Sequence, residues 1–128
     1  MGFGTFDGIH PGHISYLRQL KAMGDELFIV VARDRNAKKI KGRSPHFNEK
    51  ERLQFIRKTG LVDKPLMGHP TDFHHWLNKF QPDIIGLGHD QKADIDSLKK
   101  DFPNIEIVRM KSLKPEKYKS SLLSKDQE

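Results

Sequence analysis

Ten residues close to the start of the chain decide its fold and its chemistry. They read Gly4-Thr5-Phe6-Asp7-Gly8-Ile9-His10-Pro11-Gly12-His13. The stretch joins a short apolar start to a periodic helix through a glycine-rich turn, and its two imidazoles stand three residues apart. Glycines allow backbone N–H groups to approach a phosphate, and a helix N-terminus favours the negative charge. Because imidazole N–H groups can stabilise charge that develops on a phosphate, the stretch suits transfer of a nucleotide through its α-phosphate.

Apolar runs alternate with helical stripes over the rest of the chain. Strands are expected at residues 1–5, 27–32, 62–67, 83–87 and 105–110, and helices at 12–23, 72–80 and 93–100. A further helix is expected between Asn48, which forms a capping box with Glu51, and Gly60. Residues 33–45 are basic and are expected to be irregular, and the tail, 111–128, is polar and rich in lysine.

This alternation predicts an α/β fold: a Rossmann-like, doubly wound parallel sheet in a three-layer α/β/α single domain. Ligands of such folds bind beyond the carboxyl ends of the strands. Residues 4–13, 33–43 and 88–91 each follow a predicted strand, so we expect them to meet at the site. The first strand is short, because only Met1, Gly2 and Phe3 precede the glycine turn. Either the sheet tolerates a stub or the natural start lies upstream.

Composition restricts the possible classes of protein. The 128 residues are the size of one domain, and the net charge of +6 suits a phosphorylated ligand, a nucleic acid or a merely well-solvated surface. The absence of cysteine excludes disulfides, thiolate catalysis and a cysteine-type zinc site. No apolar run reaches transmembrane length and residues 1–30 lack a signal-peptide pattern, so a cytoplasmic protein is expected.

The ten-residue stretch resembles the H-x-G-H signature of the cytidylyltransferase-like nucleotidyltransferases. Later segments resemble the branch that holds archaeal-type FAD synthases and glycerol-3-phosphate cytidylyltransferases. They are Ala32-Arg33-Asp34, Lys38-Lys39-Ile40-Lys41-Gly42-Arg43, Gly86-Leu87-Gly88-His89-Asp90-Gln91 and Lys117-Tyr118-Lys119-Ser120-Ser121. The resemblance runs from Gly4 to about Leu123. It implies one nucleotidyltransferase domain over 1–128, with 111–128 closing the site.

The resemblance also implies a reaction and its residues. A phosphorylated small-molecule acceptor attacks the α-phosphorus of ATP or CTP in line, and pyrophosphate leaves without a covalent enzyme intermediate. His10 and His13 stabilise the transition state, and Lys41, or in its place Lys38, reaches the phosphates. The nucleotide-binding residues implied are Gly4, Thr5, Phe6, Pro11, Gly12, Gly88, Asp90, Tyr118, Ser120 and Ser121. Mg²⁺ bridges the triphosphate oxygens, and no metal ligand is assigned within the protein.

Simpler interpretations exist for most of these residues. The histidines could be ordinary loop and helix residues or a metal pair, although no convincing third ligand accompanies them. The lysines, with Arg43, could be a solvated run, Asp90 could cap the next helix, and Tyr118 could be a packing residue.

Three classes of function follow from these observations. The leading one is an enzyme that joins ATP to FMN, with glycerol-3-phosphate cytidylyl transfer next. The second is a nucleotide-binding sensor module without turnover. The third is RNA binding, suggested by the charge and by the H-x-G-H element of class I aminoacyl-tRNA synthetases; the chain is too short for a tRNA-binding domain, so nucleic acid is not expected. Relatives are commonly dimers, which makes a homodimer possible.

Overall fold

The protein folds around one five-stranded parallel sheet, seen here in a computed structural model that describes residues 1–89, 91 and 93–112, with only the backbone of Ile40 and Lys41. The strand order is β3-β2-β1-β4-β5. The strands are β1 (Gly2–Gly4), β2 (Phe28–Val31), β3 (Lys64–Met67), β4 (Ile84–Leu87) and β5 (Glu106–Arg109). The helices are α1 (Pro11–Lys21), α2 (Asp34–Lys41), α3 (Glu49–Lys58), α4 (His75–Phe80) and α5 (Ile95–Asp101). The predicted doubly wound α/β fold is confirmed.

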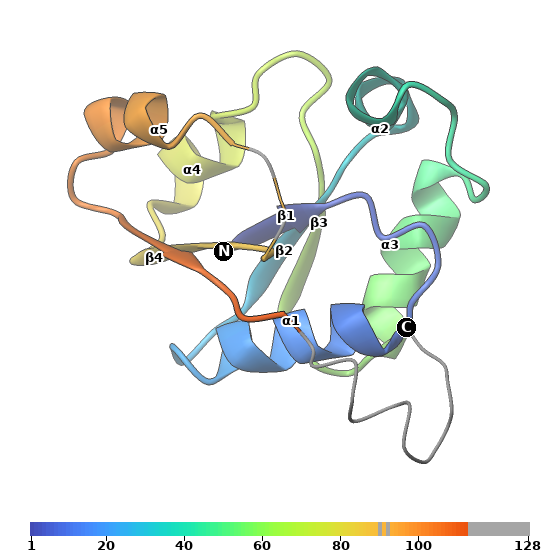
Figure 1. Ribbon diagram of the computed structural model, residues 1–128, viewed down its shortest axis with the longest axis horizontal. Helices are drawn as coiled ribbons and strands as arrows, with labels where there is room; N and C mark the ends of the chain where they lie inside the picture. The colour runs from blue at the N-terminus through green and yellow to red at the C-terminus, as the bar shows by residue number, and fades with distance from the viewer. Residues whose placement is uncertain (90, 92, 113–128) are drawn as a thin grey trace.

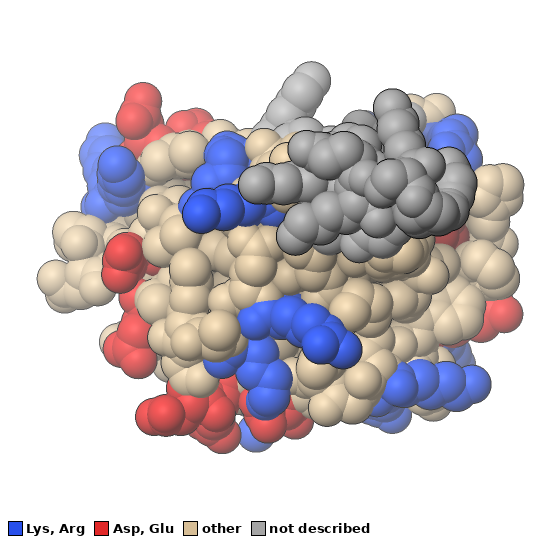
Figure 2. All heavy atoms as spheres, turned by 60° about the horizontal axis from the view of Figure 1, so that its bottom comes forward, with Lys and Arg blue, Asp and Glu red and all other residues tan. Residues whose placement is uncertain are grey.

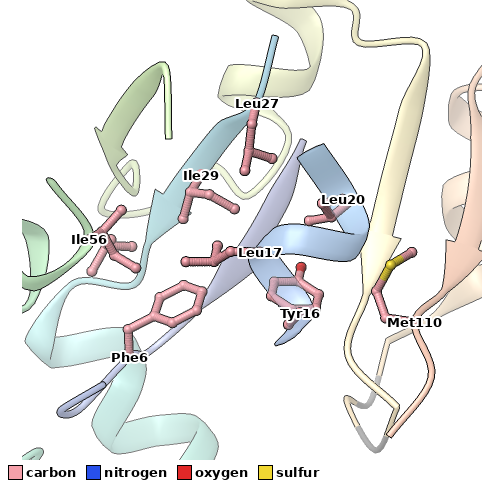
Figure 3. Close-up of a cluster of buried hydrophobic side chains, with 9 residues drawn as sticks. Phe6, Tyr16, Leu17, Leu20, Leu27, Ile29, Ile56 and Met110 are labelled. Atoms are coloured by element: carbon pink, nitrogen blue, oxygen red, sulfur yellow. The ribbon is translucent and has the colours of Figure 1, made fainter. Parts of the chain in front are cut away.

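Two apolar clusters, one on each face of the sheet, give the predicted three layers. Alternate strand residues point to opposite faces, so Ile29 and Val31 pack with α1 and α3 while Val30 packs with α4. Figure 1 shows α1 and α3 on one side of the sheet and α4 and α5 on the other. Figure 3 shows the first cluster, in which Leu17 and Leu20 of α1 lie against the strands.

Glycines allow α1 to lie close to the centre of the sheet. A Cβ atom at Gly86 of β4 would collide with Leu20, and one at Gly2 of β1 would collide with the Tyr16 hydroxyl. The short strand β1 is therefore a close-packed central strand. It pairs with β2 at three positions but with β4 only at Gly2 and Gly86.

The expectation that residues 33–45 are irregular is wrong, because Asp34–Lys41 forms α2. An acidic residue in the first turn favours a helix N-terminus, and Gly42 ends the helix with φ of 77°. Ala37 is fully buried. With so few apolar residues among the lysines, the helical stripe is too short to recognise in the sequence.

The other boundaries agree with the sequence expectations within three residues, and the Asn48 capping box is confirmed. Helix α4 begins later than expected because His69 and Asp72 accept hydrogen bonds from backbone N–H groups in a turn before it. Pro65 is tolerated in β3 because that strand lies at the sheet edge. Within the described part of the chain, no helix has the length and apolarity needed to cross a bilayer.

Candidate active site

The carboxyl ends of β1 and β4 lie where the order of strands reverses, which is where open parallel sheets have their ligand crevice. Strands β2 and β3 extend from β1 on one side, and β4 and β5 extend on the other. This reversal is where open parallel sheets bind ligands. The glycine turn follows β1, and Gly88, His89 and Gln91 follow β4, so the fold places both predicted segments after neighbouring strands at this edge of the sheet.

The two predicted catalytic imidazoles form a single unit at the N-terminus of α1. The rings of His10 and His13 are stacked, with centroids 3.8 Å apart and planes at 25°. The Nδ1 atom of His10 accepts the Gly12 N–H at 3.0 Å, and the Nδ1 atom of His13 accepts the His10 N–H at 3.3 Å. These bonds assign the proton of each neutral ring to Nε2, the atom away from the backbone. Each imidazole thus caps the helix and also carries an N–H donor.

A glycine is needed at position 12 for a structural reason that the sequence alone did not reveal. A Cβ atom at this position would lie 2.8 Å from Cε1 and 3.0 Å from Nδ1 of His10. The glycine therefore makes room for the His10 ring, in addition to its implied closeness to the phosphates.

Gly12→Ala is expected to lower kcat by tenfold or more without loss of stability. Alanine is the better helix former, but its methyl group displaces the His10 ring and breaks its stack with His13. Steady-state kinetics and thermal melts measure both effects. Gly24→Ala is the matched control, because a Cβ atom there would meet nothing within 4 Å. Normal turnover in Gly12→Ala would show that the orientation of His10 is not important.

Phe6 supports the turn through the packing of its ring and through a tight backbone conformation. The Phe6 side chain is buried, and its ring meets the edge of His13 at a centroid distance of 5.4 Å. It therefore supports His13 from the core. Its φ is 54°, and Gly8 donates to its carbonyl at 2.9 Å, so the turn is tight. A Cβ atom at Gly4 would lie 2.7 Å from the Phe6 ring, which explains this glycine by packing.

A buried arginine on α3 fixes the turn to α2. Arg52 is 0% exposed and donates to the Thr5 carbonyl at 2.8 Å and the Phe47 carbonyl at 3.0 Å. Its third bond, at 2.7 Å, goes to the carboxylate of Asp34 in the first turn of α2. Sequence reasoning missed Arg52; the available clue was an arginine next to Leu53 on the apolar face of a predicted helix.

Asp7 ties the turn to the segment before α3. Its carboxylate accepts the N–H groups of His46 at 2.8 Å and Phe47 at 2.9 Å. Desolvation acts to raise the pKa of Asp7, but these two N–H groups and the nearby charges of His46 and Arg52 hold that pKa below its usual value. The carboxylate stays ionised at neutral pH, so the loop stays bound to the turn.

Two side chains organise the segment after β4. Gln91 accepts the Gly88 N–H at 3.0 Å and donates to the Phe3 carbonyl of β1 at 3.2 Å. Arg109 donates through Nη1 to the carbonyls of Gly88 and Gln91, at 2.8 Å each. A Cβ atom at Gly88 would make only ordinary contacts with Gln91.

Several predicted residues lie outside what the structure describes. Asp90, Tyr118, Ser120 and Ser121 are not among the described residues, and neither is the side chain of Lys41, which ends α2. Lys38 and Lys39 are exposed on α2. A groove of about 670 Å³ runs from His10 along α1 past Ile14 and Arg18, so the His10 side of the pair lines a groove.

Comparisons with known proteins agree with this geometry. A family model described as cytidylyltransferase-like matches residues 1–126. The chain belongs to the cytidylyltransferase-like family. It is therefore a nucleotidyltransferase, as the stretch from Gly4 to His13 implies.

The relatives of this cytidylyltransferase-like chain include archaeal FAD synthases. It is 43% identical over 124 residues to the FAD synthase of Thermoplasma acidophilum, which covers 97% of this chain and 86% of the relative. It is 44% identical over 99 residues to that of Methanosarcina barkeri, covering 77% and 70%. Among solved structures, a lipopolysaccharide core biosynthesis protein from Thermoplasma volcanium matches with a TM-score of 0.84 and 40% identity, covering 89% of this chain and 96% of that one.

The carboxylates described near the glycine turn are largely occupied by contacts within the protein. The part of the chain that is described holds no group of three or more His, Asp or Glu residues able to bind a metal. Both oxygens of Asp7 accept backbone N–H groups, and Asp34 is bound to Arg52 through one oxygen. Mg²⁺ is commonly held by substrate phosphates and water with few protein ligands.

Proposed function

We propose that this chain is an FMN adenylyltransferase that converts ATP and FMN into FAD and pyrophosphate. The observation that carries the proposal is the stacked imidazole pair at the N-terminus of α1 in a chain 43% identical to an FAD synthase. An oxygen of the FMN phosphate forms a bond to the α-phosphorus of ATP. The bond from that phosphorus to the oxygen bridging to the β-phosphate breaks, and pyrophosphate leaves with the electron pair.

His10 and His13 serve this reaction as donors. Their Nδ1 atoms accept backbone N–H groups, so their Nε2–H groups are oriented by the helix and the turn. Donors held in advance near developing charge lower the barrier, because no reorganisation is needed as the charge appears. The positive end of α1 adds to this effect. Mg²⁺, when bound with ATP, neutralises the triphosphate charge.

Further residues complete the proposed nucleotide site. Lys41 at the end of α2, or Lys38 one turn earlier, reaches the phosphates. Gly88 and Asp90 hold the nucleoside, and Tyr118, Ser120 and Ser121 act from the segment 111–128, which closes the site. One domain over 1–128, a homodimer and a cytoplasmic location, where ATP and FMN are found, belong to the same proposal.

The distribution of surface charge is also compatible with a small-molecule substrate. On the face formed by α1, Figure 2 shows Lys and Arg interspersed with uncharged surface and with Asp and Glu at the edges, in contrast to the basic stripe of nucleic-acid-binding proteins. On the described part of this face, the charges therefore form no continuous basic stripe.

A product assay tests the proposal. The purified chain is incubated with Mg²⁺, ATP or CTP, and an acceptor: FMN, glycerol 3-phosphate or a sugar phosphate. Mass spectrometry identifies the product, and a coupled assay follows pyrophosphate. FAD with an equal amount of pyrophosphate is expected from ATP and FMN. Cytidylylated glycerol phosphate would replace the proposal with the alternative enzyme, and nucleotide binding without pyrophosphate would indicate a sensor module.

A further inference from the structure

The hydrogen-bond ladder between β1 and β4 stops where the crevice begins. The amino group of Met1 donates to the Ile84 carbonyl at 2.7 Å, and the Gly86 N–H donates to the Met1 carbonyl at 2.9 Å. In a parallel ladder the bonds repeat every two residues. Two residues beyond the Gly86–Met1 bond, the corresponding ladder bond would join the Gly88 N–H to the Phe3 carbonyl, but it is not made directly.

The carboxamide of Gln91 stands in place of that bond. The Gly88 N–H donates to Oε1 of Gln91 at 3.0 Å, and Nε2 of Gln91 donates to the Phe3 carbonyl at 3.2 Å. Both backbone groups are therefore satisfied, but through a side chain inserted between the strands. The strands are separated by one amide group at the point where they enter the site.

Tyr16 contacts the same pair of strands one step earlier. Its buried hydroxyl donates to the Gly86 carbonyl at 2.6 Å and accepts the N–H of Phe3. Figure 3 shows the Tyr16 ring on α1 beside the strands. Strands β1 and β4 are still paired at Gly2 and Gly86 at this step, so Tyr16 adds to the pairing, and the side-chain bridge in place of it begins at Gly88.

We propose that Gln91 is a positioning residue whose carboxamide holds β1 and β4 apart and so sets the width of the nucleotide crevice. The inference rests on the proposed function, because it assigns ATP to the space between the glycine turn and the loop that begins at Gly88. Arg109 supports this Gln91 carboxamide, which we call the spacer. Its guanidinium donates to the carbonyls of Gly88 and Gln91 and so fixes the loop to β5. Without the carboxamide, Gly88 and Phe3 can pair directly, and ATP must break that bond to enter.

Gln91→Leu tests the proposal through kinetics. This variant keeps an uncharged side chain but removes both hydrogen bonds. The KM for ATP is expected to rise roughly tenfold, which is the effect of one backbone hydrogen bond that ATP must break. The kcat is expected to change less than about threefold. In Gln91→Glu the carboxylate still accepts from Gly88 but cannot donate to Phe3, so an intermediate KM is expected. Unchanged KM in both variants would overturn the proposal.

Thr59→Val is the matched control for loss of a bridging side chain. The Thr59 hydroxyl donates to the Ile56 carbonyl at 2.7 Å and accepts the Leu61 N–H at 3.2 Å, at the end of α3. This variant is expected to melt at a lower temperature with an unchanged KM for ATP. If it raised KM as much as Gln91→Leu does, the effect would be general destabilisation and the proposal would be wrong.

A measurement on the wild-type chain separates the spacer from the proposed function. Scalar couplings across hydrogen bonds, measured by NMR without substrate, are expected between Gly88 N and the side-chain carbonyl carbon of Gln91, and between Gln91 Nε2 and the Phe3 carbonyl carbon. A direct coupling from Gly88 N to the Phe3 carbonyl carbon would overturn the spacer even if FAD is formed. If both couplings are present and no FAD forms, the proposed function fails while the spacer geometry stands.

Discussion

Alanine in place of His10 or His13 lowers kcat for FAD formation by about a hundredfold or more, the expected effect of losing one oriented transition-state donor. The rings are stacked at 3.8 Å and each is held by a backbone N–H, so removing one also loosens the other. The double variant is therefore expected to be little worse than either single one, because residues that act as a unit have non-additive effects. Rates of pyrophosphate release at saturating ATP and FMN measure these effects.

Helix capping and catalysis by His10 can be separated. His10→Ala also removes the acceptor for the Gly12 N–H, which costs about 1 kcal/mol of helix stability. His10→Ser restores an N-cap oxygen but has no imidazole, so it should melt near the wild-type temperature and remain as slow as His10→Ala. Recovery of turnover in His10→Ser would assign His10 a capping role alone.

The sequence predicted the elements that local patterns define and the segments that the topology brings together. The apolar run before Ala32 and the Asn48 capping box each became the expected element. Parallel strands place their carboxyl ends at one edge, so the placing of the glycine turn and of Gly88 after the neighbouring strands β1 and β4 followed from the order of elements. The imidazole pair could be recognised because both residues lie within one turn of helix.

Long-range hydrogen bonds could not be predicted. Arg52 bonds to Thr5, 47 residues away, and Gln91 bonds to Phe3, 88 residues away, and no local pattern encodes either contact. Helix α2 was missed because, among its described side chains, the buried ones are the neighbours Asn36 and Ala37, which give no periodic apolar stripe. The sequence thus predicted the strands, most of the helices and the position of the imidazole pair better than the long-range polar contacts between them.

Asp34→Ala is expected to destabilise the fold by about 3 kcal/mol, because it removes the carboxylate that is hydrogen-bonded to the buried Arg52 guanidinium, although the charge of Asp7 still acts on that group. Arg52 is 0% exposed and the Asp34 side chain is 44% exposed, so the charge that cannot reach water is that of the arginine. Its two remaining bonds, to the carbonyls of Thr5 and Phe47, supply partial charges only. Urea denaturation measures the free energy of unfolding. Asp96→Ala in the first turn of α5 controls for loss of a helix-start acid and should cost under about 1 kcal/mol.

The Asp34–Arg52 pair also predicts the result of a double-mutant cycle. Arg52→Met removes the buried charge together with the donors to Thr5 and Phe47, so it destabilises through unsatisfied carbonyls. In Arg52→Met the Asp34 carboxylate has lost its partner, but it is half-exposed and can be solvated. A further change of Asp34 to alanine therefore removes little additional stability. The double variant should therefore be more stable than the sum of the single losses by about 1–3 kcal/mol. Additive losses would mean that the two side chains stabilise α2 and the glycine turn independently, and the ion pair would not be what joins them.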